Sequence, residues 1–354
     1  MRHKELTYSM TGVNKRQIDL VQDLIGSHIQ RTHMNTNMGR IISGFGHYAG
    51  LIDIGSSIMA LHCDGVGTKL LVAQAMNNFS TVGIDCIAMN VNDLVCVGST
   101  PFAFVDYIAV AKPDPRVLSA IAESLVKGAE EAGVAIVGGE TAVVPDLLSK
   151  GHGRNSIDLS GTAIGVVRKR SELVLGDRVR KGDIILGIES SGIHANGFTL
   201  VRKALLKRDL RKRVGNLERS LGDELLTPTR IYVRPIIDLF RSGVEVHGIA
   251  HITGGSFTKL RRINDMVNYR LDSMPDPPEI FKVIQLKGKV RFAEMHRTFN
   301  MGIGLCIIAP SRSIEAIISS FDRYKMRTFK IGNIEKPGTG EVSCRVLNKQ
   351  TILC

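Results

Sequence analysis

The chain has 354 residues, of which 44% are hydrophobic and 23% are charged, and it contains 36 glycines, a composition typical of a two-domain α/β enzyme with many tight turns. No apolar run approaches the roughly 18 residues of a membrane-spanning helix, and the first residues lack the apolar core of a signal peptide, so we expect a cytoplasmic protein without a membrane partner. The formal net charge is +12, but the absence of Trp and the low aromatic content (5%) favour a basic surface that serves small phosphorylated ligands over one that binds nucleic acid.

The first half of the chain alternates between helical and strand-like patterns. Apolar residues at helical spacing predict a short amphipathic helix near residues 18–29, followed by a glycine-rich turn at residues 43–46. The next predicted elements are a strand at 58–63, a helix at 84–95, a strand at 101–109, a helix at 115–132 that Gly133 ends, and strands at 134–137 and 160–167.

The basic run at residues 168–170 predicts the boundary between an N-terminal domain, residues 1–170, and a C-terminal domain, residues 171–354. The elements expected beyond it are strands at 183–188, 246–252 and 302–309 and helices at 198–205, 227–240 and 313–323, with an irregular segment at 263–289 and a final strand and polar tail. Because helices and strands alternate in both halves, we expect a layered α/β (α+β) fold.

The first predicted strand runs directly into a turn that combines a carboxylate, two glycines, a hydroxyl and a cation. Asp64 is followed by Gly65 and Gly67, which allow positive φ and close approach of the backbone to a ligand, and then by Thr68 and Lys69. In the helix at 84–95, Asn92 and Asp93 lie at the edge of the apolar stripe.

A third acidic segment follows the strand at 134–137, where Gly138, Gly139, Glu140 and Thr141 predict another turn. An Asp-Gly pair alone indicates only a turn, and one helical Asp only a surface carboxylate. The three segments together favour a site at which Asp64, Asp93 and Glu140 hold Mg²⁺ beside a phosphate, because Mg²⁺ prefers oxygen ligands. No GxxxxGK[ST] sequence occurs, so the site is not a Walker A loop.

In this order, the motifs closely resemble those of the aminoimidazole ribonucleotide synthetases, the phosphoribosylformylglycinamidine cyclo-ligases of purine biosynthesis. The most specific segments are residues 64–70, 138–141, 190–197, 229–233, 251–255 and 295–300. The resemblance implies a two-domain fold whose N-terminal domains pair in a homodimer. It also implies ATP-dependent closure of formylglycinamidine ribonucleotide to aminoimidazole ribonucleotide, with ADP and phosphate as the other products.

Two departures from the family pattern occur near the N-terminus. The family often has a lysine near the nucleotide in the first helix, but residues 23–27 contain none, so His28 or Arg31 would have to replace it. The family's Gly-Gly-Phe-Gly is here Ser43-Gly44-Phe45-Gly46.

The reaction has to make a formamide carbonyl electrophilic, and phosphorylation of its oxygen by ATP would turn that oxygen into a leaving group. Residues expected to bind ATP and Mg²⁺ are Asp64, Gly65, Gly67, Thr68, Lys69, Asn92, Asp93, Gly138, Gly139, Glu140 and Thr141. Residues expected to contact the ribonucleotide are Ser191, His194, Asn196, Arg230, Thr253, Gly254, Gly255 and Arg297, with residues 253–255 around its 5′-phosphate. Lys69 is expected to act in catalysis, and His194 and His251 either transfer protons or only position the substrate.

Other functions with the same architecture remain as alternatives. A hydrogenase-maturation protein would use a C-terminal cysteine, but the residues before Cys354 lack the Pro-Arg-Ile of that family. A selenophosphate synthetase would place a reactive cysteine in the glycine-rich turn, where this chain has Ser43. A basic, non-catalytic protein bound to nucleic acid is disfavoured by the intact acidic residues Asp64, Asp93 and Glu140.

Overall fold

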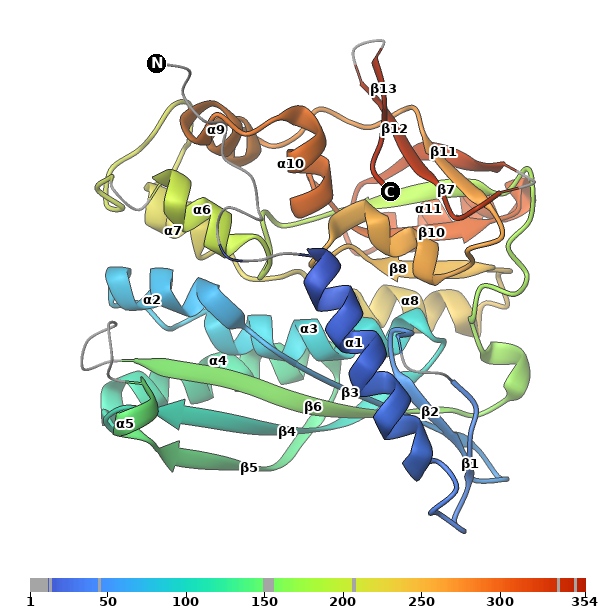
Figure 1. The fold of residues 1–354 in the computed structure, drawn as a ribbon, viewed down its shortest axis with the longest axis horizontal. Helices are drawn as coiled ribbons and strands as arrows, with labels where there is room; N and C mark the ends of the chain where they lie inside the picture. The colour runs from blue at the N-terminus through green and yellow to red at the C-terminus, as the bar shows by residue number, and fades with distance from the viewer. Residues whose placement is uncertain are drawn as a thin grey trace.

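The computed structural model describes residues 12, 15–43, 46–148, 156–205, 208–335, 338–346 and 349–354. Gly44 and Phe45 of the predicted glycine-rich turn lie outside the described residues. The described chain forms two halves, each built on its own β-sheet (Figure 1). No strand crosses the basic run at 168–170, since the last strand of the first sheet ends at Val167 and the first strand of the second begins at Ile184.

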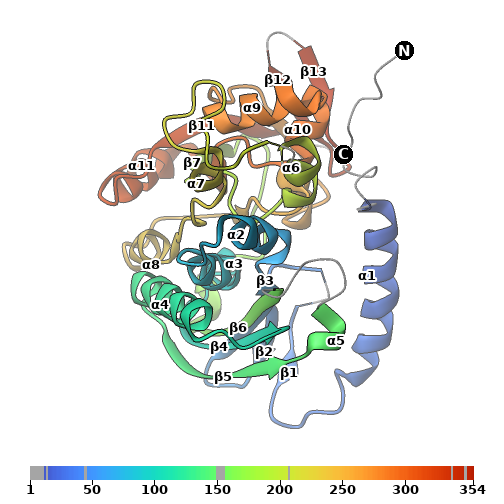
Figure 2. The same ribbon diagram turned by 90° about the vertical axis from the view of Figure 1, so that its left-hand side faces the viewer.

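The N-terminal sheet has six strands that are antiparallel except for the β4–β5 pair. Their spatial order is β1 (Arg40–Ile41), β2 (Gly50–Asp53), β3 (Ile58–Gly65), β6 (Ile157–Val167), β4 (Thr100–Val110) and β5 (Ala135–Val143). Helices α2 (Leu70–Met76), α3 (Val82–Cys96) and α4 (Pro115–Ala132) lie between this sheet and the C-terminal half (Figure 1 and Figure 2).

The C-terminal sheet has seven strands, and only β12 and β9 pair in parallel. Their order is β13 (Lys349–Ile352), β12 (Val342–Val346), β9 (Asn268–Leu271), β11 (Thr328–Glu335), β7 (Ile184–Glu189), β10 (Ile303–Ala309) and β8 (Gly248–His251). Its helices are α6 (Phe198–Leu205), α7 (Leu221–Leu225), α8 (Val233–Arg241), α9 (Glu279–Gly288), α10 (Phe292–Thr298) and α11 (Ile314–Asp322), and the short 3₁₀ helix η5 (Ser256–Arg262) follows β8. None of the described helices is long and apolar enough to cross a membrane.

Helix α4 shows why several elements could be predicted well. The side chain of Asp114 accepts a hydrogen bond from the backbone N–H of Arg116, and Pro115 occupies the first helical position. Gly133 ends the helix in a left-handed conformation with φ of 72°, which glycine adopts without strain. These start and stop signals confirm the predicted bounds of 115–132.

Helix α3 is the centre of the molecule, and every residue of it except Ile84 is buried. One side packs on β3, β6 and α4 of its own half, and the other side meets β8 and α8 of the C-terminal half. Asn92 and Asp93 therefore do not lie at an exposed helix edge. They face the C-terminal half and need polar partners there, because buried polar groups are costly without hydrogen bonds.

Residues 227–232 were predicted as the first turns of a helix, but α8 begins only at Val233. Their peptide groups instead bind polar side chains of the N-terminal half: Thr227 O accepts from Lys69 Nζ (2.7 Å), and Thr229 N donates to Asp85 Oδ1 (2.8 Å). Asn92 binds both Arg230 O (2.9 Å) and Tyr232 N (2.9 Å). These contacts take the place of helical hydrogen bonds, and the segment has no regular secondary structure.

The prediction of a turn at residues 138–141 is also wrong, because these residues continue β5 and pair in parallel with residues 105–108 of β4. A Cβ at Gly139 would lie 2.5 Å from Asp106 Oδ1, so a larger residue there would displace the Asp106 side chain. The segment predicted as irregular, 263–289, contains β9 and α9, and the predicted polar tail contains β12 and β13. Val342, Ser343 and Cys344 of β12 are all buried, a run too short to identify as a strand in the sequence.

Lys69 joins the two halves rather than facing a ligand. Its ammonium is fully buried, 2.7 Å from Asp85 Oδ2 and 2.7 Å from Thr227 O, and Thr68 Oγ1 lies 3.2 Å from Thr199 Oγ1 of α6. Burial lowers the pKa of Lys69, and the carboxylate of Asp85 acts in the opposite direction. The predicted phosphate contact and catalytic role of Lys69 do not fit this geometry, because all of its hydrogen-bonding directions are used inside the domain interface.

We predict that Lys69→Met lowers the free energy of unfolding by about 3–5 kcal/mol, because it leaves the charge of Asp85 buried without its partner. Chemical denaturation measures the change, and Lys287→Met, at an exposed position, is the matched control with a change within about 0.5 kcal/mol. A Lys69→Met protein as stable as the wild type that has lost turnover would instead restore the catalytic role.

Candidate active site

A cluster of buried polar side chains lies where α3 meets β3 and β8. Asp93 of α3 is 4% exposed, and its two carboxylate oxygens face two imidazoles: Oδ1 lies 2.6 Å from His251 Nδ1, and Oδ2 lies 3.3 Å from His62 Nε2. His62 is two residues before Asp64 on β3, so both side chains point toward α3. The sequence brings these groups together from one helix and two strand ends.

The protons on His251 follow from its neighbours. Asn92 Oδ1 accepts from Tyr232 N, so Asn92 Nδ2 is the donor that lies 3.4 Å from His251 Nε2. His251 Nε2 therefore accepts, and Nδ1 carries the proton that it donates to Asp93. Burial lowers the pKa of His251, against the raising effect of Asp93. The imidazole is thus neutral and held in one tautomer.

His62 has polar contacts at both of its ring nitrogens. Asn90 Nδ2 donates to Asp64 O (3.1 Å) and Cys86 O (2.9 Å), so its Oδ1 is the atom that lies 3.2 Å from His62 Nδ1. Both ring nitrogens of His62 therefore face acceptor oxygens. Sequence reasoning missed His62 and Asn90, although the period of two on β3 and the spacing of three between Asn90 and Asp93 place each beside a predicted residue.

Asp64 and Asp93 respond differently to their surroundings. Burial acts to raise the pKa of Asp93, but His62, Lys259 and His251 outweigh it and lower the pKa to about 2. Burial raises the pKa of Asp64, and the negative charge of Asp93 raises it further, whereas the N–H of Gly65 lowers it. Asp93 is thus a permanent anion between histidines, and Asp64 is the carboxylate that a cation would stabilise.

The predicted convergence of Asp64, Asp93 and Glu140 on Mg²⁺ is wrong within one chain. In the part of the chain that the structure describes, no group of three His, Cys, Asp or Glu side chains is arranged to hold a metal ion. Strand register explains this, because Glu140 pairs with Tyr107, Tyr107 with Ser160, and Ser160 with Gly65, about 14 Å across the sheet. Glu140 also lies on the sheet face that points away from α3, whereas Asp64 points toward it.

His194 lies near this cluster but has a different environment. It is 1% exposed, its ring centroid is 6.4 Å from that of His251, and its Nε2 accepts from Ser191 N (3.3 Å). Its proton is therefore on Nδ1, which has no hydrogen-bond partner among the described residues. Burial lowers the pKa of His194 far below 6.5, and the positive charges of Lys69 and Arg230 lower it further.

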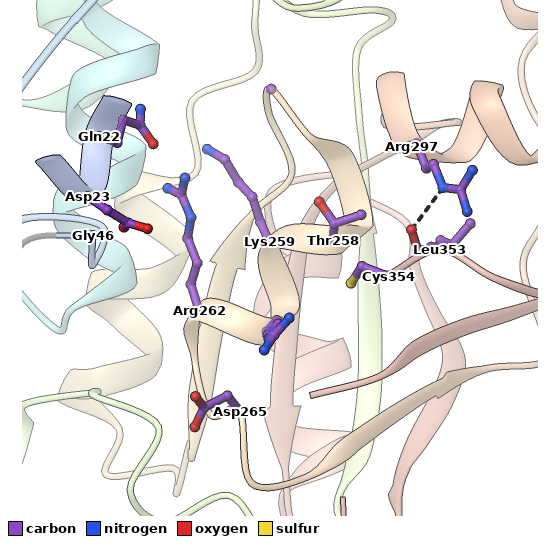
Figure 3. A pocket seen from close by; sticks show the side chains of 12 residues that line it. Gln22, Asp23, Gly46, Thr258, Lys259, Arg262, Asp265, Arg297, Leu353 and Cys354 are labelled. Carbon is purple, nitrogen blue, oxygen red and sulfur yellow. Dashed lines mark hydrogen bonds between the residues drawn. The ribbon is translucent and has the colours of Figure 1, made fainter. Parts of the chain in front are cut away.

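The remaining predicted substrate residues lie in two places. Ser191 Oγ donates to Pro228 O and Arg230 lies 3.4 Å from Glu189, both within the C-terminal half. Asn196 approaches Met89 of α3 across the contact between the halves. The others border a cavity of about 800 Å³ between η5, α1 (Lys15–Ile29) and the C-terminal residues (Figure 3). Gly254 and Arg297 line it directly, Arg297 also donates to Leu353 O, and Thr253 and Gly255 adjoin it at the start of η5.

Cations dominate the lining of this cavity. Lys259, Arg261, Arg262 and Arg297 are opposed by Asp23 and Asp265. Lys259 links the cavity to the buried cluster, because its charge acts on both Asp64 and Asp93. The direction of Lys259, Arg261 and Arg262 depends on the 3₁₀ geometry of η5 and could not be predicted from the sequence.

Comparisons with known proteins agree over most of the chain. Residues 46–167 match the family model "AIR synthase related protein, N-terminal domain", and residues 180–345 match the corresponding C-terminal domain. A phosphoribosylformylglycinamidine cyclo-ligase of Methanothermobacter thermautotrophicus is 44% identical over 98% of this chain and 99% of its own length. One of Pyrococcus furiosus is 46% identical over 94% and 96%.

The chain belongs to the phosphoribosylformylglycinamidine cyclo-ligase family. The family and the two-domain α/β fold are thus confirmed, and these relatives favour the cyclo-ligase over the hydrogenase-maturation and selenophosphate alternatives. Solved structures share the fold at lower identity. The HypE–HypF complex matches with a TM-score of 0.62 at 19% identity, over 87% of this chain and 93% of that chain. AaThiL complexed with AMPPCP and TMP matches with a TM-score of 0.60 at 14% identity, over 95% of both chains.

The buried neutral state of His194 predicts how stability depends on pH. Because its folded pKa lies below its unfolded value of about 6.5, the unfolded chain binds the proton more readily, and stability falls as the pH drops below 6.5. The titration of His194 lowers the free energy of unfolding by up to about 1.4 kcal/mol for each pH unit below 6.5.

His194→Asn should therefore flatten the decline in unfolding free energy between pH 6.5 and 5, measured by denaturation at each pH. Asn suits the test because it tolerates the positive φ of 66° at this position. Equal slopes in the two proteins would show that His194 binds protons equally in both states.

Proposed function

We propose that the protein closes formylglycinamidine ribonucleotide to aminoimidazole ribonucleotide with consumption of ATP, in de novo purine biosynthesis. The observation that supports this most directly is the neutral His251, which Asp93 holds in place at the domain interface. Asp64 and the cationic cavity lie close to this pair. Residues 1–170 would bind ATP and form the dimer, and residues 171–354 would bind the ribonucleotide. The family membership supports the same reaction.

Ring closure requires a proton to leave the attacking amidine nitrogen. His251 is suited to accept it at Nε2, because Asp93 fixes Nδ1–H and stabilises the imidazolium that forms. The weak contact of 3.4 Å from Asn92 leaves Nε2 able to exchange partners. His194 is suited to a different task, since its unpartnered Nδ1–H can donate to a substrate oxygen while the ring remains neutral.

Asp64 is the carboxylate that fits Mg²⁺ here, because Mg²⁺ is commonly bound by one or two carboxylates together with substrate phosphates. When bound, the ion would offset negative charge on the phosphates. Asp93 fits this role less well, since both of its oxygens already face histidines. Gly65 and Gly67 remain proposed nucleotide contacts, and Gly67 has φ of 67° with open space at its Cβ position. The nucleotide contacts proposed for residues 138–141 stay a prediction.

We also propose that the N-terminal sheets of two chains pair in a homodimer. The sheet face that points away from α3 carries large exposed apolar side chains, namely Leu61, Phe102, Val105, Tyr107 and Val137. Monomeric proteins rarely expose a contiguous apolar patch of this kind. A second copy of the same face would cover it symmetrically.

The chemistry predicts the fate of the formyl oxygen. That oxygen attacks the γ-phosphorus of ATP and ADP leaves; the amidine nitrogen then attacks the activated carbon, and phosphate departs with the formyl oxygen while the nitrogen loses its proton. Substrate labelled with ¹⁸O in the formyl group should therefore deliver the label to inorganic phosphate, measured by mass spectrometry. His251→Gln should slow this turnover by about 10² to 10⁴.

Label found in water, or a phosphorylated protein trapped by acid quench, would contradict direct oxygen transfer. Absence of aminoimidazole ribonucleotide from wild-type protein with Mg-ATP and the ribonucleotide would contradict the function itself.

A further inference from the structure

We propose that Lys259 and Arg262 form a phosphate-binding pair in the cavity between η5 and α1, an assignment that rests on the proposed function and extends it to two new residues. The ligand chemistry is a phosphate carried either by the ribonucleotide or by ATP. Neither residue belongs to the motifs that identified the site.

The direction of the pair follows from the geometry of η5. A 3₁₀ helix has three residues per turn, so side chains three positions apart lie above one another. Lys259 and Arg262 have this spacing on η5, and both line the cavity. Figure 3 shows their side chains side by side, extending toward Gln22 and Asp23 of α1. The two cationic side chains thus point into the same cavity.

The ammonium of Lys259 is held in place before any ligand arrives. It donates to Thr253 Oγ1 and lies 5.7 Å from the centre of the Tyr48 ring. Thr253 itself adjoins Gly254, which lines the same cavity. An ordered cation beside a hydroxyl and a glycine backbone provides the donors that a phosphate group needs.

Within the described ranges, no carboxylate forms an ion pair with Lys259 or Arg262, although Asp23 and Asp265 line the same cavity. Burial lowers the pKa of Lys259, and the charge of Arg262 lowers it further, against Asp93, which raises it. A phosphate dianion between the two side chains would remove their repulsion. Arg297 differs, because it is occupied by the carbonyls of Leu353 and Ile352.

The position of the pair links the cavity to the reaction. Lys259 acts electrostatically on Asp64 and Asp93, so a phosphate bound here lies close to the proposed metal ligand and to the carboxylate that holds His251. The cavity of about 800 Å³ has room for a ribonucleotide or for the triphosphate of ATP. The structure therefore favours phosphate recognition at the site rather than a separate regulatory pocket.

The test measures steady-state kinetics and direct binding with full-length Lys259→Met and Arg262→Met, with Lys287→Met as the charge-matched control. Each variant should raise the KM for one phosphorylated substrate by about 10- to 100-fold, the effect of a lost charge-assisted hydrogen bond, while kcat changes less than threefold. A rise confined to the ribonucleotide assigns its 5′-phosphate, and a rise confined to ATP assigns the triphosphate. Lys259→Arg, which keeps the charge, should recover most of the loss.

A second readout does not depend on turnover. Ribose 5-phosphate and inorganic phosphate should raise the melting temperature of wild type and of Lys287→Met, and neither should do so in Lys259→Met whose circular dichroism is native. If both KM values and the phosphate-induced shifts are unchanged in Lys259→Met and Arg262→Met, the pair does not bind phosphate. If the wild type shows the phosphate-induced shifts, Lys259→Met loses them and the wild type shows no cyclisation, the pair stands and only the proposed function is overturned.

Discussion

The fold depends on how α3 satisfies its buried polar side chains. Asp85, Asn92 and Asp93 are all enclosed between the two halves of the molecule, where an unpartnered polar group costs roughly 1–3 kcal/mol. Each of them has at least one partner in the C-terminal half: Thr229 binds Asp85, Tyr232 N binds Asn92, and His251 binds Asp93. Backbone groups of residues 227–232 and one strand end are therefore fixed by side chains from the other domain.

This constraint also builds the active site. The same helix that joins the halves holds His251 through Asp93 and holds the backbone beside Arg230 through Asn92. Its Asn90 orients His62 and the backbone of Asp64. Separating the two halves would break the dyad and the substrate contacts together. The same hydrogen bonds consequently hold both the domain interface and the site. Lys69 contributes to the interface alone.

The sequence predicted elements whose signals are local. The helix at 115–132 has its own cap, proline and terminal glycine, and β3, β6, β7 and β10 have apolar patterns long enough to identify. The sequence also singled out His251, Asp64 and Asp93, which the structure brings into one buried cluster, although their roles stay a prediction. The resemblance to a known family added the function, which no local pattern contains.

Features set by distant contacts could not be predicted. Gly138 and Gly139 look like a turn, but parallel pairing with β4 makes them strand residues. Residues 227–232 look helical, but buried side chains of α3 bind their peptide groups. In the sequence, Lys69 resembles a phosphate ligand, but in the structure Asp85 and Thr227 bind its ammonium. Lys259 resembles a surface charge in the sequence, but on η5 its side chain lines the cavity.

The central claim is that Asp93 holds His251 as a neutral imidazole with its proton on Nδ1. Nitrogen-15 NMR of selectively labelled histidine measures this tautomer directly, with His251→Gln used to assign the signal. At pH 7 we expect one protonated Nδ1 and one unprotonated Nε2, and in Asp93→Asn a mixture of tautomers. A protonated Nε2 in the wild type, or a spectrum unchanged in Asp93→Asn, would contradict the account.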